Sequence, residues 1–92
     1  MGSRVGDFLK ESRIKEGLSQ REVSQYLGYP TAQVISDWER GVRSPPSIML
    51  KMLVKLYAVP MEQVFTLIMD EKTALLERKV RADLGLRRVG GG

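Results

Sequence analysis

The chain has 92 residues, a formal net charge of +4 at pH 7, and neither cysteine nor histidine. Without these two residue types, disulfides, the usual zinc sites and the common nucleophile–base pairs are excluded. The apolar content of 42% suffices for one small core, and the basic excess is compatible with a polyanionic partner, so we expect a binding domain without enzymatic activity, metal or cofactor.

A first helix is predicted from about residue 4 to residue 16. Val5, Phe8 and Leu9 have the i, i+3, i+4 spacing that marks the buried side of a helix. Gly17 then suits the end of that helix, because glycine readily adopts the left-handed backbone conformation found there. The first three residues resemble a cloning remnant and do not enter the fold prediction.

Two short helices are predicted next. Ser19 followed three residues later by Glu22 is a capping box, which predicts the start of the second helix, and Gly28 suits its end. The third helix is expected to begin after Thr31 as its N-cap and to end at Gly41.

A loop containing Pro45 and Pro46 precedes the fourth helix, for which Ser47 is the expected cap. Pro60 suits the first position of the fifth helix. The apolar residues expected on these two helices are Met49, Met52, Leu53, Leu56 and Tyr57, then Val64, Phe65 and Ile68. Because no segment alternates as a strand would, we predict an all-α fold of five helices.

The pattern changes after Met69. Residues 70–92 are highly charged and end in three glycines, with apolar residues spaced by about four at Leu75, Leu76, Val80 and Leu84. This stretch either continues the fifth helix or forms a sixth, and it either covers the domain, pairs with a second copy or frays, since an isolated helix of this length is marginal. We therefore divide the chain into a domain at 4–69 and a helical extension with a flexible tail at 70–92.

The third predicted helix has two chemically different sides. Ile35 and Trp38 lie three residues apart and are expected to face the core. The opposite side has the helical spacing i, i+3, i+4, i+7 and carries Gln33, Ser36, Asp37 and Arg40. Two short helices joined by a tight break, with a polar outer side on the second, satisfy the requirements of a helix-turn-helix whose second helix enters the major groove of DNA.

The chain resembles the helix-turn-helix domains of the phage Cro and lambda-repressor class over residues 4–69. The motifs that carry the resemblance are GLSQ at 17–20, EV at 22–23, LG at 27–28, ISDWERG at 35–41, PP at 45–46 and YAVP at 57–60. Between Gly28 and Ile35 this chain is one residue longer than the common pattern, and the extra residue lies within 29–31.

The resemblance implies roles for individual side chains. Bases are then contacted by Ala32, Gln33, Ser36 and Asp37. Phosphates are contacted by Gln20, Thr31, Arg40, Arg43 and Ser44. An ion pair is expected between Arg13 and Glu39. Glutamine can bond adenine, and aspartate can accept from cytosine or, alternatively, orient a neighbouring arginine.

These features predict a sequence-specific regulator of transcription that binds double-stranded DNA, as a homodimer on a palindromic operator. Residues expected at the dimer interface are Leu67, Ile68, Leu75, Leu76 and Val80. The alternative is an adaptor or an antitoxin that binds a protein partner through residues 70–92. No apolar run is long enough to span a bilayer and the N-terminus lacks a signal peptide's apolar stretch, so a cytoplasmic location without a membrane partner is expected.

Overall fold

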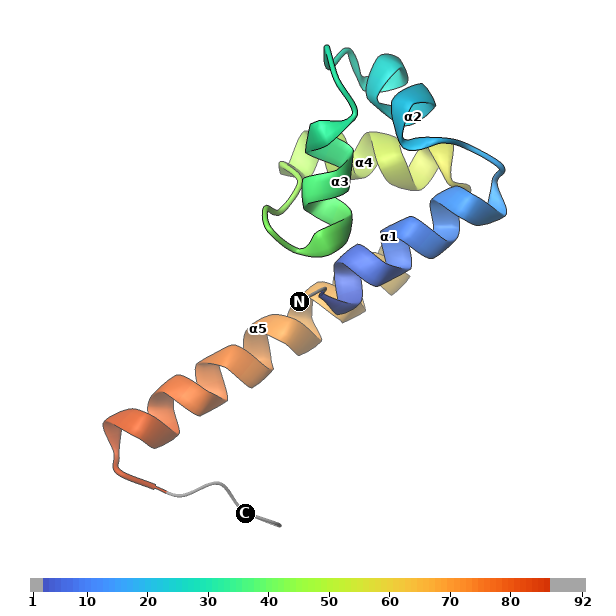
Figure 1. Ribbon diagram of the computed structural model, residues 1–92. Coiled ribbons are helices and arrows are strands. Elements are labelled where there is room, and N and C mark those ends of the chain that lie inside the picture. Colours follow the sequence, from blue (N-terminus) through green and yellow to red (C-terminus); the bar gives the residue numbers. More distant parts are fainter. Residues whose placement is uncertain (1–2, 87–92) are drawn as a thin grey trace.

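The computed structural model describes residues 3–86, and this part of the chain is built from α-helices without strands. The helices are α1 (Arg4–Lys15), α2 (Gln20–Leu27), α3 (Gln33–Arg40), α4 (Ser47–Leu56) and α5 (Met61–Asp83) (Figure 1). The predicted all-α class is thereby confirmed. The three glycines expected to form a flexible tail, residues 90–92, lie outside the described residues.

The first two helices begin at serine caps. The Ser19 hydroxyl accepts from the Glu22 N–H at 3.0 Å, and Glu22 Oε1 accepts from the Ser19 N–H at 2.9 Å, which confirms the capping box. The hydrogen bond from the Ser19 backbone lowers the pKa of Glu22. Ser3, which was left out of the prediction, caps α1 because its hydroxyl accepts from the Gly6 N–H at 2.8 Å.

The predicted caps of the later helices were wrong by one residue. The N-cap of α3 is Ala32, whose carbonyl already accepts from Ile35 and Ser36, while the Thr31 hydroxyl accepts only from the Gln33 N–H at 3.3 Å. Pro46, with an extended backbone, is the N-cap of α4, and Pro60 is the N-cap of α5. Ser47 is therefore the first helical residue and makes no capping hydrogen bond.

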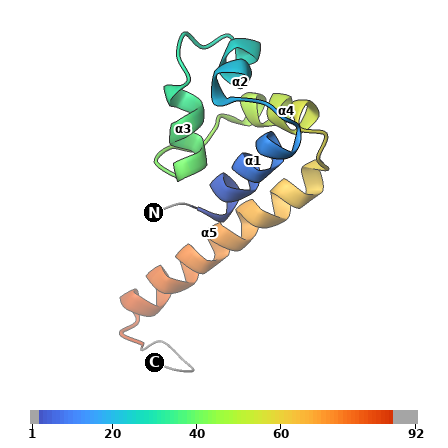
Figure 2. The same ribbon diagram turned by 45° about the vertical axis from the view of Figure 1, so that its right-hand side comes forward.

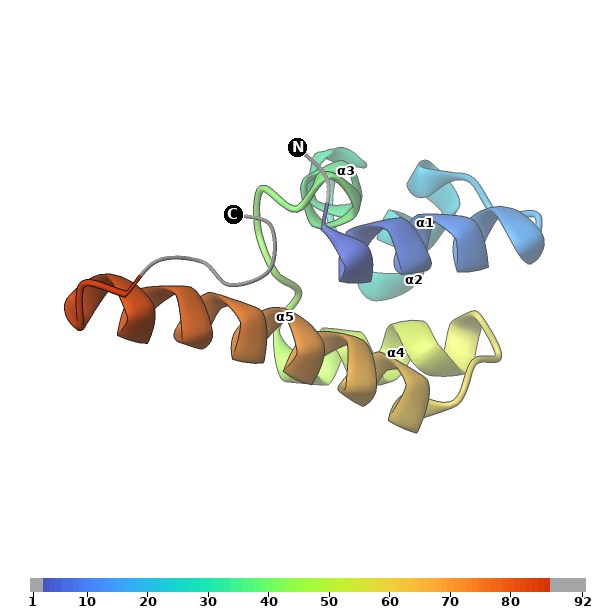
Figure 3. The same cartoon turned by 90° about the horizontal axis from the view of Figure 1, so that it is seen from below.

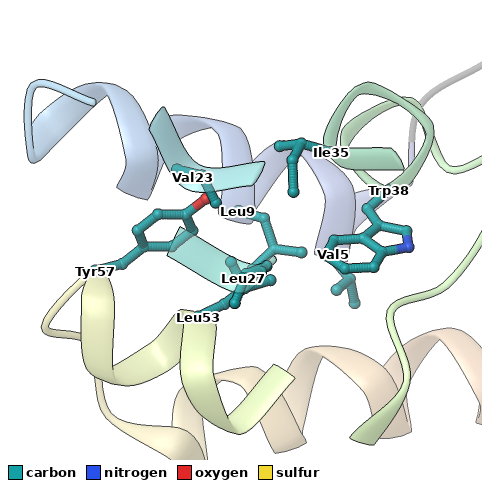
Figure 4. Packing of buried hydrophobic residues seen from close by; sticks show 8 residues of the cluster. All are labelled: Val5, Leu9, Val23, Leu27, Ile35, Trp38, Leu53 and Tyr57. Carbon is teal, nitrogen blue, oxygen red and sulfur yellow. The ribbon is translucent and has the colours of Figure 1, made fainter. Parts of the chain in front are cut away.

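The helices form two layers, with α1, α2 and α3 on one side and α4 and α5 on the other (Figure 3). One cluster of buried side chains from four helices lies between them, formed by Val5, Leu9, Val23, Leu27, Ile35, Trp38, Leu53 and Tyr57 (Figure 4). The expected inner faces of α3 and α4 thus both contribute to the core. Burial of this apolar area from water is the main force that assembles helices too short to be stable alone.

Helices α1 and α3 approach each other closely at Gly6. A Cβ atom placed on Gly6 would lie 2.4 Å from the Glu39 carbonyl oxygen and 2.8 Å from that of Trp38. At the end of α3, Gly41 has φ +77° and packs against Ser3. Glycine at position 6 therefore sets the distance between the N-terminal half of α1 and the C-terminal half of α3.

Helix α5 extends well beyond the other helices (Figures 1 and 2). Its 23 residues correspond to about 34 Å of helix. The radius of gyration, 15.6 Å, exceeds the roughly 12 Å of a compact domain of this length because of this projection. The charged segment after Met69 continues α5 without a break rather than forming a sixth helix.

The inner face of α5 has Val64 fully buried, with Leu67 and Ile68 half-buried against the core. Phe65 is 61% exposed, because it lies about 100° around the helix from Val64 and so cannot share that face. Farther along, Glu71 Oε1 accepts from the Val5 N–H at 3.1 Å and ties α5 to the start of α1.

Beyond Glu71, the large apolar residues of α5 are exposed to solvent. Leu75 and Leu76 are each 61% exposed, and Val80 is 44% exposed. The extension therefore does not cover the domain from which it grows, which removes one of the three roles considered for it. None of the helices within residues 3–86 is both long and apolar enough to cross a membrane.

Candidate nucleic-acid interface

The turn between α2 and α3 is shaped by Gly28 and held by Tyr29. Gly28 ends α2 with φ +87°, a conformation that residues with a Cβ rarely adopt. The following Tyr29 donates its N–H to the Ser24 carbonyl at 2.9 Å and packs edge-on against Trp38, with ring centroids 5.7 Å apart. Trp38 is therefore a core residue that also fixes the direction of the turn.

Helix α3 is anchored through its inner face. Ile35 is 1% exposed and Trp38 is 3% exposed, whereas Gln33 and Arg40 are exposed on the opposite side. Gly41 ends α3 in the left-handed conformation, and the Asp37 carbonyl accepts from the N–H groups of the loop that follows. The inward and outward faces of α3 are therefore those that the sequence predicts.

A buried ion pair joins α1 to the end of α3. Arg13 donates from Nε to Glu39 Oε2 at 2.6 Å and from Nη2 to Oε1 at 3.0 Å. A third hydrogen bond runs from Arg13 Nη1 to the Leu18 carbonyl at 2.8 Å, so the guanidinium also fixes the loop before α2. The hydrogen bonds to Glu39 raise the pKa of Arg13, and burial raises that of the nearby Tyr57.

The Gln20 side chain joins this network. Gln20 Nε2 donates to Glu39 Oε1 at 3.0 Å, although the resemblance assigns Gln20 to a phosphate. An amide has two N–H donors and one carbonyl acceptor, so the second donor of Gln20 remains available for a phosphate oxygen. The network thus places Gln20 at the N-terminus of α2, where backbone N–H groups favour anions.

Asp37 is the centre of a second polar cluster on the outer face of α3. Its Oδ1 accepts from Gln33 Nε2 and from Arg40 Nη2, each at 2.8 Å. Its Oδ2 lies 3.8 Å from Arg43 Nε. Arg40 Nε also donates to the Ser36 hydroxyl at 3.1 Å. Three of the polar side chains singled out by the sequence therefore contact this one carboxylate, and Ser36 is linked to it through Arg40.

Surface hollows flank α3 on both sides. One of about 520 Å³ lies between α3, α1 and the start of α2 and is lined by Asp7, Lys10, Gln20, Ser36, Glu39, Arg40 and Val42. The other, of about 350 Å³, is lined by Tyr29, Pro30, Thr31, Gln33, Val34, Asp37 and Arg43. Between them α3 forms a ridge, which is the shape that entry into a DNA groove requires.

Lys10 is not among the residues that the sequence predicts to contact DNA. The structure places it beside Gln20 and Arg40 in the larger hollow. The only sequence signal for this position is that Lys10 lies one turn before Arg13 on α1, and that signal is too weak to distinguish it from other surface lysines.

The remaining predicted site residues lie at the margins of the ridge. Ala32 is half-buried at the start of α3, and Thr31 is exposed next to it in the turn. Ser44 is exposed in the loop after α3, close in sequence to the 73%-exposed Arg43. All of the assigned polar contacts thus belong to α3, to its two flanking loops or to the start of α2.

The fold and this surface define a helix-turn-helix protein. A sequence model of the helix-turn-helix family matches residues 9–64, which is more than half of the chain. The protein therefore belongs to the helix-turn-helix family of the Cro/C1 type, also described as XRE-like, whose members are DNA-binding regulators of transcription. A comparison with curated proteins found no match.

Proposed function

We propose that this protein regulates transcription by recognising a specific DNA sequence, with α3 in the major groove and two copies on a palindromic operator. The observation that carries the proposal is the ridge formed by α3. Its inner face is locked by Ile35 and Trp38, and its outer face presents a row of polar side chains between two hollows. One such helix reads only a few base pairs, so a second copy on the next turn of DNA multiplies discrimination.

The proposed base contacts are Ala32 at the N-cap of α3 and Gln33 and Ser36 in its first half. The proposed phosphate contacts surround them and comprise Gln20, Thr31, Arg40, Arg43 and Ser44, to which we add Lys10. Arginine and lysine at the edge of a groove supply the part of affinity that does not depend on sequence. Glu39 does not oppose this attraction, because Arg13 neutralises it.

The proposed dimer contact is the extension of α5. Of the five candidates, Leu67 and Ile68 are already half-buried against the core of their own chain, whereas Leu75, Leu76 and Val80 are exposed. A solitary amphipathic helix in water is marginally stable, and packing against another helix is the usual way to stabilise it. Binding to two half-sites requires two copies of the protein, so we propose that the partner helix comes from a second copy.

Selection of bound duplexes from a random DNA pool, at fixed physiological salt, tests the proposal. We expect enrichment of a palindrome whose half-sites are one helical turn, about 34 Å, apart. The absence of any enrichment with a folded protein would contradict it. That result would favour the alternative in which residues 70–92 bind a different protein, since the same exposed leucines suit either partner.

A further inference from the structure

The carboxylate of Asp37 is surrounded by donors from its own chain. The side chain is only 14% exposed, although it lies on the outer face of α3. Oδ1 already accepts two hydrogen bonds of 2.8 Å, from Gln33 and Arg40, and Oδ2 faces Arg43 at 3.8 Å. With both lone pairs of Oδ1 occupied, only Oδ2 could accept a hydrogen bond from a base, and the side chain as a whole is little exposed.

In the hydrogen bond between Gln33 and Asp37, the glutamine must be the donor. An ionised carboxylate only accepts hydrogen bonds, so the amide of Gln33 must turn its NH₂ group, and not its carbonyl, toward Asp37. The Gln33 carbonyl and the second N–H then have a defined orientation at the exposed start of α3. Recognition of adenine by glutamine needs one acceptor and one donor in a fixed order, and an amide rotated by 180° presents them in reverse.

Asp37 also restricts the neighbouring guanidinium. Arg40 is held by Asp37 through Nη2 and by Ser36 through Nε, so two of its three nitrogens have fixed partners. Long side chains lose rotamer entropy when they are ordered on binding, and ordering them beforehand reduces that cost. Asp37, Arg40 and Arg43 together carry one net positive charge, so the cluster as a whole still attracts phosphate.

We propose that Asp37 is a positioning residue, which contacts no base itself and determines the base preference at the position read by Gln33 by fixing the orientation of the Gln33 amide. This inference rests on the proposed DNA-binding function. It assigns to Asp37 a role different from the base contact that the resemblance implies, and it follows from the donors that surround the carboxylate.

The test compares Asp37→Asn, Gln33→Ala and the double variant with the wild type. Binding is measured on duplexes that carry each of the four bases at every half-site position, at one salt concentration. Asparagine keeps the size of aspartate, but its amide can accept or donate, so both orientations of Gln33 become available. Asp70→Asn is the matched control, because it removes an aspartate charge from α5, away from the reading face.

We expect Asp37→Asn to reduce discrimination at one base position by at least about fivefold, which is the low end of what a bidentate glutamine contributes. The affected position should be the one that Gln33→Ala affects, and the double variant should discriminate no less than Gln33→Ala alone. Binding to random DNA should strengthen, because a negative charge beside the phosphates is lost. Asp70→Asn should retain the wild-type preference.

Two results would overturn the inference. One is an unchanged preference in Asp37→Asn; the other is a loss at a position different from that of Gln33, which would identify Asp37 as a base contact. If Asp37→Asn does not fold, nuclear magnetic resonance of the wild type decides, since the order parameter of the Gln33 side-chain NH₂ group should be higher than that of the exposed Gln63. An order parameter for Gln33 as low as that of Gln63 would overturn the inference. Failure of the wild type to prefer any sequence would instead contradict the proposed function.

Discussion

Arg13 and Glu39 are held together by two hydrogen bonds, of 2.6 and 3.0 Å, at the contact between α1 and the C-terminal end of α3. Their side chains are 10% and 3% exposed, so neither charge can be solvated by water if its partner is removed. The pair links α1 to α3. The pair therefore fixes the position of α3 relative to α1 and also contributes to the stability of the fold.

Arg13→Ala should lower the free energy of unfolding by about 3–5 kcal/mol, because Glu39 would be left buried with Gln20 as its remaining polar partner. For a domain of this size, that corresponds to a drop in melting temperature of more than about 10 °C. Thermal unfolding followed by circular dichroism measures it. Arg21→Ala, at an exposed position of α2, is the control and should change the melting temperature little. An unchanged melting temperature for Arg13→Ala would contradict the prediction.

Gly6→Ala should destabilise the protein by about 1–3 kcal/mol, because the new methyl group meets backbone oxygens of α3 that cannot rotate away. Helices α1 and α3 must then move apart, which also shifts α3 relative to the rest of the domain. Chemical denaturation with urea measures the effect, and Thr73→Ala on the exposed part of α5 is the control. Full stability of Gly6→Ala would show that the close contact between α1 and α3 is not retained in solution.

Gln33→Ala should weaken binding to the selected operator by about 1–3 kcal/mol and relax the preference at one base position. Glutamine reads a base edge through two hydrogen bonds, whereas alanine makes none. Competition binding against random DNA of the same length separates the two effects. An equal loss on operator and random DNA would argue against a base-reading role.

Arg43→Ala should weaken binding to all duplexes alike and lower the slope of log K against log salt by about 1. Arg43 is 73% exposed at the edge of α3 and only loosely paired with Asp37, so its charge is available to a phosphate. The measurement is affinity over a series of salt concentrations. A loss confined to the operator, with an unchanged slope, would instead place Arg43 at a base.

Replacing both Leu75 and Leu76 by serine should convert a dimer into a monomer without unfolding the domain, because both side chains are exposed in the single chain. Burial of one leucine contributes about 1.5–3 kcal/mol, so the dissociation constant should rise at least a hundredfold. Sedimentation equilibrium measures it, with Thr73→Ser as the control. A wild-type protein that is monomeric at micromolar concentration would contradict the proposed dimer.

Local signals were sufficient for most of the fold. The capping box at Ser19 and Glu22 and the left-handed glycines at positions 28 and 41 act on backbone groups within a few residues, so they can be identified without knowledge of the rest of the chain. The spacing of Ile35 and Trp38 likewise separates the two faces of α3. The family resemblance rests on these same residues.

Other features depend on which helices pack against each other, and the local sequence pattern does not contain that information. Phe65 is as apolar as Val64, but only Val64 points at the core, because the packing of α5 against α1 selects one face. Lys10 resembles any surface lysine until α1 is placed beside α3. Ser3 matters because it caps α1 and itself packs against Gly41 at the end of α3.

The all-α class, the approximate helix ends and the two faces of α3 follow from local sequence, because helix ends and amphipathic faces are set by neighbours three or four residues away. Tertiary structure decided that Lys10 lies beside the polar side of α3 and that α5 projects beyond the other helices rather than folding back. The first outcome depends on the contact between α1 and α3, which Arg13 and Glu39 join, and the second on the contact of Glu71 with Val5 near the start of α1.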